Sequence, residues 1–376
     1  MRALCLPLVI APALACSAPK PPPALCAKEA GDAECVAQEA PEPPTGAVKW
    51  HPGHYMQMML GESTRAQQPL RFGWYDEIGR NRAIAGVTLR VKWGELEGDE
   101  GEYRFDTLRR ELDKLRSLPS PKQLFIRVHD RTYGNGGGCE SDMYPPYLRN
   151  GNGCAATANG SIARIWDPAV ADRLIALYRA LAEAFDADPA FEGIMLIRET
   201  ATSGKVSDSS YSHSAYKNQL KRLVEAASEA FARSNVVLPV NYLGGQENVD
   251  ELIAHAAEVG AGQGGPDVLP DGLANQRPLA YNTLDGSSTG IEYRKRMPVL
   301  YSIESSQLGG SLCERCQPRD LHRYAENELN ASHLFWSRNT WAGSASQQWE
   351  SGILPWINEN PLRNTSCPPG YEACSK

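Results

Sequence analysis

Two glutamates in the sequence stand at the ends of short, largely apolar runs. Glu199 follows the run 193–197 after the single residue Arg198, and Glu304 follows the run 298–303 directly. Such a run closed by charge is typical of a buried parallel strand whose carboxyl end reaches a functional site, because burying an unpaired charge is costly. Two facing carboxylates suit cleavage of a glycosidic bond, in which one protonates the leaving oxygen and the other attacks or stabilises the oxocarbenium-like centre.

Other polar and aromatic residues also close apolar runs and are candidates to line the same site. As substrate contacts we predict Trp93, His129, Asp130, Arg198, Asn241, Asp267 and Trp336. The tryptophans could stack on sugar faces, because an indole combines an apolar face with a polar edge. Each position also has a structural interpretation, since a tryptophan can pack at the top of a barrel and a strand-end polar residue can order its own loop.

The elements that must position these residues alternate between strands and helices. Strand-like runs are expected at 54–60, 85–93, 123–130, 193–199, 236–243, 264–269, 299–304 and 333–336. The clearest helix, 168–185, opens with Asp167 as N-cap and Pro168 at its first position. A strand followed by a helix, repeated eight times, predicts an α/β fold of the (β/α)8 TIM-barrel type as a single domain over residues 47–376. The alternative, a doubly wound sheet, lacks its usual phosphate-binding glycine loop.

Three segments resemble clan A glycoside hydrolases, especially the β-galactosidase-like group. The stretch GVTLRVKWGELEGDEGEYRFDTLRRELDKLR resembles that group's second βα unit through Trp93, Leu96, Glu97, Gly101, Tyr103 and Phe105, with Gly98 where the pattern usually has Pro. The stretches FEGIMLIRETA and MPVLYSIESS resemble the clan's fourth and seventh strands. The resemblance implies a carbohydrate substrate, Glu199 as acid/base, Glu304 as nucleophile, and retention of anomeric configuration without a metal or organic cofactor.

Arg198 departs from the clan's pattern, which usually has Asn directly before the acid/base glutamate. A cation there could pair with an anionic sugar, or could lower the pKa of a general acid that must stay protonated. The first hypothesis is therefore a retaining glycosidase in which Glu199→Gln or Glu304→Gln abolishes cleavage with little change in thermal midpoint. The alternatives are a non-catalytic glycan-binding barrel and an enzyme that cleaves uronic-acid polymers by β-elimination.

The N-terminal part of the chain has the composition of an export signal and a tether. Residues 1–16 combine one Arg, a short apolar stretch and small residues before Cys16, a candidate lipidated residue in a lipoprotein-like signal; a soluble secreted protein is the alternative. Residues 17–46 are an Ala/Pro-rich linker with too few large apolar side chains to form a core. We therefore expect location in the bacterial cell envelope or outside the cell, with membrane contact only through the lipid. The net charge of -7 and the lack of a basic run give no reason to expect a nucleic-acid partner.

Eight cysteines downstream of Cys16 fall into close pairs, which favours disulfides in an exported chain. The expected pairs are Cys26 with Cys35, Cys139 with Cys154, Cys313 with Cys316, and Cys367 with Cys374. The Cys313 and Cys316 pair could instead form half of a metal site, although no second cysteine or histidine pair completes one.

Overall fold

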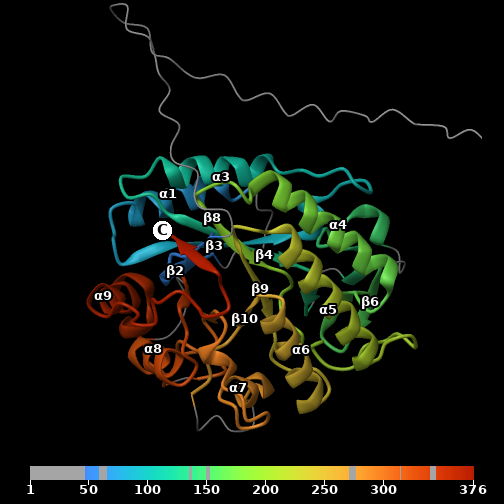
Figure 1. The fold of residues 1–376 in the computed structure, drawn as a ribbon. Coiled ribbons are helices and arrows are strands. Elements are labelled where there is room, and N and C mark those ends of the chain that lie inside the picture. The colour runs from blue at the N-terminus through green and yellow to red at the C-terminus, as the bar shows by residue number, and fades with distance from the viewer. Residues whose placement is uncertain are drawn as a thin grey trace, which may run out of the picture. The chain divides into compact units, whose positions relative to one another are not determined.

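The computed structural model describes residues 47–58, 66–134, 138–149, 153–270, 277–313, 315–338 and 344–376. Its centre is a closed barrel of eight parallel strands (Figure 1), which confirms the predicted TIM barrel. In barrel order the strands are β2 (Gly53–Gln57), β3 (Ile84–Lys92), β4 (Gln123–His129), β8 (Phe191–Met195), β9 (Asn235–Pro239), β10 (Gly262–Gly265), β11 (Val299–Ile303) and β12 (His333–Ser337), which returns to β2.

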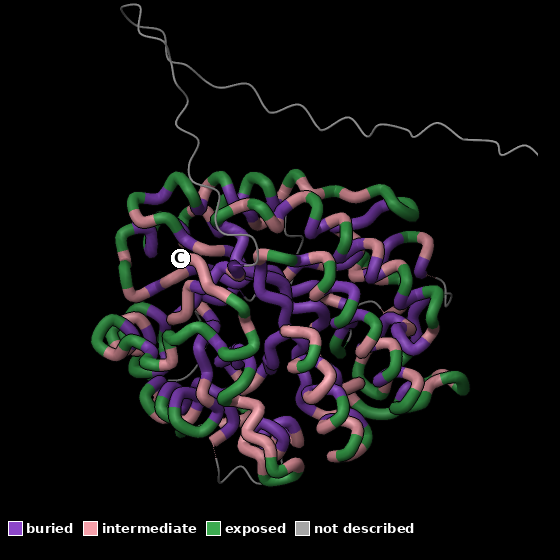
Figure 2. The backbone as a smooth tube through the Cα atoms, viewed as in Figure 1, coloured by how far each residue is buried: buried purple, intermediate pink, exposed green. Residues whose placement is uncertain are grey.

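Helices surround the barrel on its outside (Figure 1). They are α1 (Gln68–Ile78), α2 (Trp93–Leu96), α3 (Asp106–Arg116), α4 (Pro168–Phe185), α5 (His213–Ala230), α6 (Gln246–Glu258), α7 (Leu279–Leu284), α8 (Pro318–Asn327) and α9 (Leu354–Glu359). The predicted start of α4 is confirmed, because the Asp167 carboxylate accepts a 3.0 Å hydrogen bond from the backbone N–H of Ala169. Buried stretches gather in the strands and exposed stretches on the outer helices (Figure 2).

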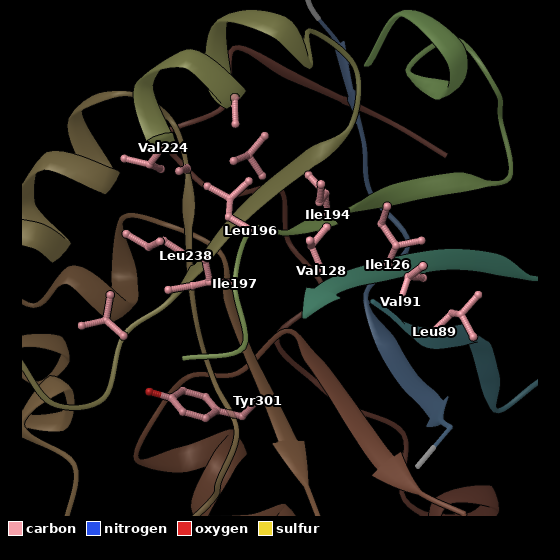
Figure 3. Packing of buried hydrophobic residues seen from close by; sticks show 14 of the residues in the cluster. Leu89, Val91, Ile126, Val128, Ile194, Leu196, Ile197, Val224, Leu238 and Tyr301 are labelled. Atoms are coloured by element: carbon pink, nitrogen blue, oxygen red, sulfur yellow. The ribbon is translucent and has the colours of Figure 1, made fainter. Parts of the chain in front are cut away.

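The side chains of each strand alternate between two separate cores. Outward-facing residues such as Leu89, Val91 and Ile126 pack toward the helices (Figure 3). Inward-facing residues form a second cluster that fills the barrel: Tyr55, Phe125, Met195, Val237, Leu300 and Phe335. Glycines make room for these rings, since a Cβ on Gly193 would lie 2.6 Å from the Phe125 ring. The barrel interior is thus a packed core, and its carboxyl-terminal end is where barrels of this type hold their active sites.

A small antiparallel sheet extends the connection between β4 and α4. It consists of β5 (Arg131–Tyr133), β7 (Gly160–Ala163) and β6 (Cys154–Thr157), in that order. The disulfide Cys139–Cys154 ties this sheet to the preceding loop. The long connection after β4 therefore includes a small sheet, whose first strand follows β4 almost directly.

The first and last strands of the described residues, β1 (Ala47–Lys49) and β13 (Ala373–Ser375), pair in a two-stranded parallel sheet. The predicted disulfides Cys139–Cys154, Cys313–Cys316 and Cys367–Cys374 are present, so the thiols of Cys313 and Cys316 are not free to bind a metal. Within the described ranges, no three metal-binding side chains cluster and no helix has the length and apolarity to cross a membrane. The signal 1–16 with Cys16, the linker 17–46 and the Cys26–Cys35 pair lie outside the described residues.

Candidate active site

The two glutamates predicted from the sequence lie at the same end of the barrel. Glu304 follows β11 directly, and Glu199 follows β8 after the short, bent segment 196–198. One guanidinium group contacts both of them. Arg198 Nη2 lies 3.3 Å from Glu304 Oε2, and Arg198 Nε lies 3.6 Å from Glu199 Oε1. One guanidinium thus bridges the two carboxylates at the barrel mouth.

Glu304 is surrounded by three arginines. Arg90 Nη2 donates a short hydrogen bond to Glu304 Oε1, Arg198 contacts the other oxygen, and Arg127 Nη1 lies 3.9 Å from Oε1. Burial alone would raise the pKa of Glu304, but the charges of Arg198, Arg90 and Arg127 outweigh it and lower the pKa. Glu304 is therefore an ionised carboxylate at neutral pH, as a nucleophile requires.

The arginines around Glu304 are held from below by polar residues of the barrel interior. Arg127 is fully buried and donates a 2.6 Å hydrogen bond to Ser302 Oγ, which donates in turn to Gln57 Oε1 at 2.7 Å. Arg90 and Arg127 are paired in the register of β3 and β4, so their side chains point into the barrel side by side. The cationic surroundings of Glu304 are thus built on rigid strands.

Glu199 is held by two neutral donors. Tyr133 Oη donates to Glu199 Oε1 at 2.5 Å, and Asn241 Nδ2 donates to Glu199 Oε2 at 2.5 Å. The amide of Asn241 is oriented because its Oδ1 accepts from the backbone N–H groups of Ala201 (2.9 Å) and Tyr242 (2.8 Å). Asn241 thus reaches the predicted site, where it positions a carboxylate.

A cavity of about 300 Å³ opens beside Glu199 at the ends of β8 to β11. Its lining includes Glu199, Asn241, Tyr242, Asp267 and Tyr301. Burial, with the negative charges of Glu304 and Glu199, raises the pKa of Asp267 to about 7. The predicted residue Asp267 therefore faces the cavity, with its carboxyl group about half protonated near neutral pH.

His129 and Asp130 differ in what they can contact. His129 belongs to the inward-facing register of β4, and its Nε2 is buried with no hydrogen-bond partner among the described residues. Burial and the charges of Arg90 and Arg198 lower its pKa, so the imidazole is neutral. Asp130 is fully buried and accepts from Arg131 (2.8 Å) and from the backbone N–H of Arg198 (3.0 Å). Asp130 is therefore a structural residue, and its prediction as a substrate contact is wrong.

The two tryptophans predicted to stack on sugar are also corrected by the structure. Trp93 is completely buried in α2, where its indole N–H donates to Glu97 Oε2 at 2.8 Å. Trp336 is equally buried, and its indole N–H donates to His54 Nδ1 at 3.0 Å. Phe335 points into the barrel, so Trp336, the next residue of β12, must point outward to the helices. Neither indole presents a face to a ligand.

Three residues of the site were not predicted. Arg90 and Arg127 could have been found from strand periodicity, because they occupy inward positions between outward apolar residues. Tyr133 is 37% exposed, and the Arg198 guanidinium lies over its ring at 5.4 Å. No sequence pattern indicates Tyr133, since its place depends on how β5 pairs with β7.

Comparison with known proteins shows that this chain is similar to solved structures in its fold. No family model matches the chain, and no curated protein matches it by sequence. Among solved structures, endo-glycoceramidase II from Rhodococcus sp. in a five-membered iminocyclitol complex is similar, with TM-score 0.52 and 12% identity over 83% of this chain and 80% of that one. The GH5_18 protein from Streptomyces cattleya in complex with Manb1-4GlcNAc is similar too, with TM-score 0.51 and 12% identity over 83% of this chain and 82% of that one. The chain thus has the barrel fold of these two proteins.

Proposed function

We propose that this chain is a retaining glycoside hydrolase in which Glu304 is the nucleophile and Glu199 the acid/base. The observation that carries the proposal is the shared contact with Arg198, because two carboxylates within reach of one guanidinium are close enough together to act on a single glycosidic bond. The barrel mouth is the end where TIM-barrel enzymes hold their active sites. The similarity of the fold to solved glycoside hydrolases supports the same interpretation.

Glu304 has surroundings suited to a nucleophile, and Glu199 is held in a fixed orientation by two neutral donors. Glu304, kept ionised by its arginines, attacks the anomeric carbon while Glu199 gives a proton to the leaving oxygen. A water molecule then hydrolyses the glycosyl–enzyme ester, with Glu199 accepting the water's proton. Tyr133 and Asn241 hold the Glu199 carboxylate in one orientation through both steps.

The test is release of reducing ends from a broad panel of polysaccharides and oligosaccharides. We expect wild type to release sugar, and Glu304→Gln and Glu199→Gln to lose at least about 10³-fold in kcat, since each removes a group that acts only in the transition state. The exposed Glu258, on the outer end of α6, provides a matched control, and Glu258→Gln should keep full activity. Full activity of Glu304→Gln would show that the assignment is wrong.

A second candidate function, glycan binding without cleavage, is favoured by the position of Arg198. Its guanidinium contacts both carboxylates, so it occupies space beside each of them that a substrate would need during catalysis. A binding protein could keep this arrangement unchanged. Saturable binding of a glycan, with no product after prolonged incubation and no difference between wild type and Glu304→Gln, would identify this second function.

We also propose that the protein is exported and anchored by a lipid on Cys16. The lipobox-like end of residues 1–16 supports this, and the three disulfides of the described residues suit an oxidising compartment. Labelled palmitate fed to the producing cells should be incorporated by wild type and not by Cys16→Ser. Secretion of unlabelled wild-type protein into the medium would instead indicate a soluble exported form.

A further inference from the structure

The barrel mouth carries more positive than negative charge. Arg90, Arg127 and Arg198 all approach Glu304, and Glu199 is the second ionisable group that Arg198 contacts. Three guanidinium groups thus face two carboxylates. Burial and the neighbouring arginines lower the pKa of Arg90 to about 10 and of Arg127 to about 9, so these guanidinium groups still carry their charge at neutral pH. The excess therefore persists at neutral pH when both glutamates are charged, and it grows when Glu199 holds its catalytic proton.

The neighbouring charges do not cancel this excess. Lys92 pairs with Asp142 at 2.8 Å, and Arg131 pairs with Asp130 at 2.8 Å, so each of these cations has its own counter-ion. Asp267, the remaining carboxyl group, lines the cavity and carries only part of a negative charge because its pKa is raised to about 7. The positive charges of the arginines also act on His129. Burial and the charges of Arg90, Arg198 and Arg127 lower the pKa of its imidazole.

Arg198 is the arginine that can change partners. Its Nε is buried without a hydrogen-bond partner in the described part of the chain, since Glu199 Oε1 lies 3.6 Å away. Its Nη2 contact with Glu304 is 3.3 Å long, at the weak end for a charged pair. Arg127, in contrast, is fixed by Ser302 inside the barrel. Arg198 lies over the partly exposed Tyr133 ring, which could support the guanidinium in a shifted position.

We infer that the substrate is an anionic glycan, carrying a carboxylate or a sulfate, and that this anion draws the Arg198 guanidinium away from its contacts with Glu199 and Glu304. The inference rests on the proposed glycosidase function and adds the substrate class. A neutral sugar offers only hydroxyl groups, which cannot replace two carboxylates as acceptors for a guanidinium. An anionic group can, so its binding both pairs with Arg198 and frees Glu199 and Glu304 from their contacts with it.

The experiment compares aryl glycosides in matched pairs, each uronide beside the hexoside that differs only in lacking the carboxylate, together with sulfated and unsulfated oligosaccharides. We expect wild type to prefer the anionic member by roughly 10- to 100-fold in kcat/KM, the range of one charge-assisted hydrogen bond. Arg198→Asn introduces the residue usual in the clan and should reduce this preference to about threefold or less. The reduction should come from a lower kcat/KM for the anionic substrates. The exposed Arg222 of α5, paired with Asp172, is the matched control, and Arg222→Asn should keep the wild-type preference.

The outcomes separate the substrate class from the reaction. Equal cleavage of both members of every pair, abolished by Glu304→Gln, would leave the proposed function standing and overturn the anionic substrate. If no pair is cleaved, the proposed function fails, and binding measurements then test the anionic substrate class. Uronate or sulfated oligosaccharides that bind wild type and not Arg198→Asn would support this class. Equal binding to both proteins, or no binding, would overturn it. Ultraviolet-absorbing unsaturated products from uronates alone would support the anionic class while replacing hydrolysis by β-elimination. The uronide and sulfate arms identify which anion is recognised.

Discussion

Tyr133 donates a 2.5 Å hydrogen bond to Glu199 from a strand that lies outside the barrel. The acid/base candidate is therefore positioned partly by the small sheet β5–β7–β6 and only partly by the barrel itself. Its other donor, Asn241, comes from the segment after β9. The position of the Glu199 carboxylate therefore depends on both the barrel and the small sheet β5–β7–β6.

Removal of the Tyr133 hydroxyl should lower turnover without unfolding the protein. We expect Tyr133→Phe to reduce kcat by roughly 10- to 100-fold, because a catalytic group displaced by about 1 Å loses activity on that scale. Tyr133 is partly exposed, so the thermal midpoint should stay within about 2 °C of wild type. Tyr147→Phe is a matched control, since the Tyr147 hydroxyl contacts Arg173 away from the two glutamates. Unchanged kcat in Tyr133→Phe would show that Asn241 alone positions Glu199.

Glu199 and Glu304, the two residues proposed to be catalytic, should differ in what they contribute to stability. Glu304→Gln leaves three arginines without their shared counter-ion, which should lower the free energy of unfolding by roughly 3 kcal/mol. Glu199→Gln leaves neutral donors behind and should cost about 1 kcal/mol or less. The sequence alone predicts little change for either substitution, because the arginine cluster is not visible in it. Urea unfolding measures both values.

The double variant Arg198→Asn/Glu304→Gln provides the check on this difference. If the loss in Glu304→Gln comes from repulsion among the arginines, removing Arg198 as well should restore part of the lost stability. Additive losses in the double variant would show that the destabilisation has another origin.

Asp267 should make the protein less stable as the pH rises toward neutrality. Its pKa is about 7 in the folded protein and 3.8 as the ordinary value, so between these pH values the folded protein keeps a proton that the unfolded chain has lost. The cost of ionising Asp267 is therefore absent at pH 4 and complete above about pH 7. Asp267→Asn should unfold like wild type at pH 4 and be more stable by roughly 1–3 kcal/mol at pH 8. The exposed Asp172 provides the control variant Asp172→Asn. If Asp267→Asn differed from wild type in the free energy of unfolding by the same amount at pH 4 and pH 8, the raised pKa would be contradicted.

The strands could be predicted from sequence because each barrel strand is buried on both faces and reads as one apolar run. The same property hides which way each side chain points. Phe335 and Trp336 are both apolar, yet Phe335 fills the barrel and Trp336 packs under the helices. A shift of one residue along a strand moves every side chain to the other face of the sheet. A run in which all residues are apolar does not show which residues face the barrel interior. Glu199 and Glu304 could be predicted because a charged residue at the end of a buried strand often belongs to a functional site. The fully buried pair of Asp130 and Arg131 shows that such a charge can instead have a structural role.

At the opposite, amino-terminal end of the barrel, Glu192 should contribute stability that is lost in acid. The carboxylate is fully buried and accepts hydrogen bonds from His51, through Nδ1 at 2.6 Å and the backbone N–H at 2.8 Å. His333 Nε2 lies 3.8 Å from it, which is beyond hydrogen-bond length but within electrostatic range. Burial alone would raise the pKa of Glu192, but the imidazoles of His333 and His51 outweigh it and lower the pKa to about 2.

A lowered pKa means that the unfolded chain binds this proton more readily than the folded protein does. The stabilisation is therefore complete above pH 4.5, the ordinary value, and disappears as the pH falls through about 2. Glu192→Gln should be less stable than wild type by roughly 3 kcal/mol at pH 7, and the two should converge near pH 2. Urea unfolding at several pH values measures the difference, with the exposed Glu258→Gln as a control that should follow wild type throughout. A gap between wild type and Glu192→Gln that persists unchanged to pH 2 would show that Glu192 acts through packing and not through its charge.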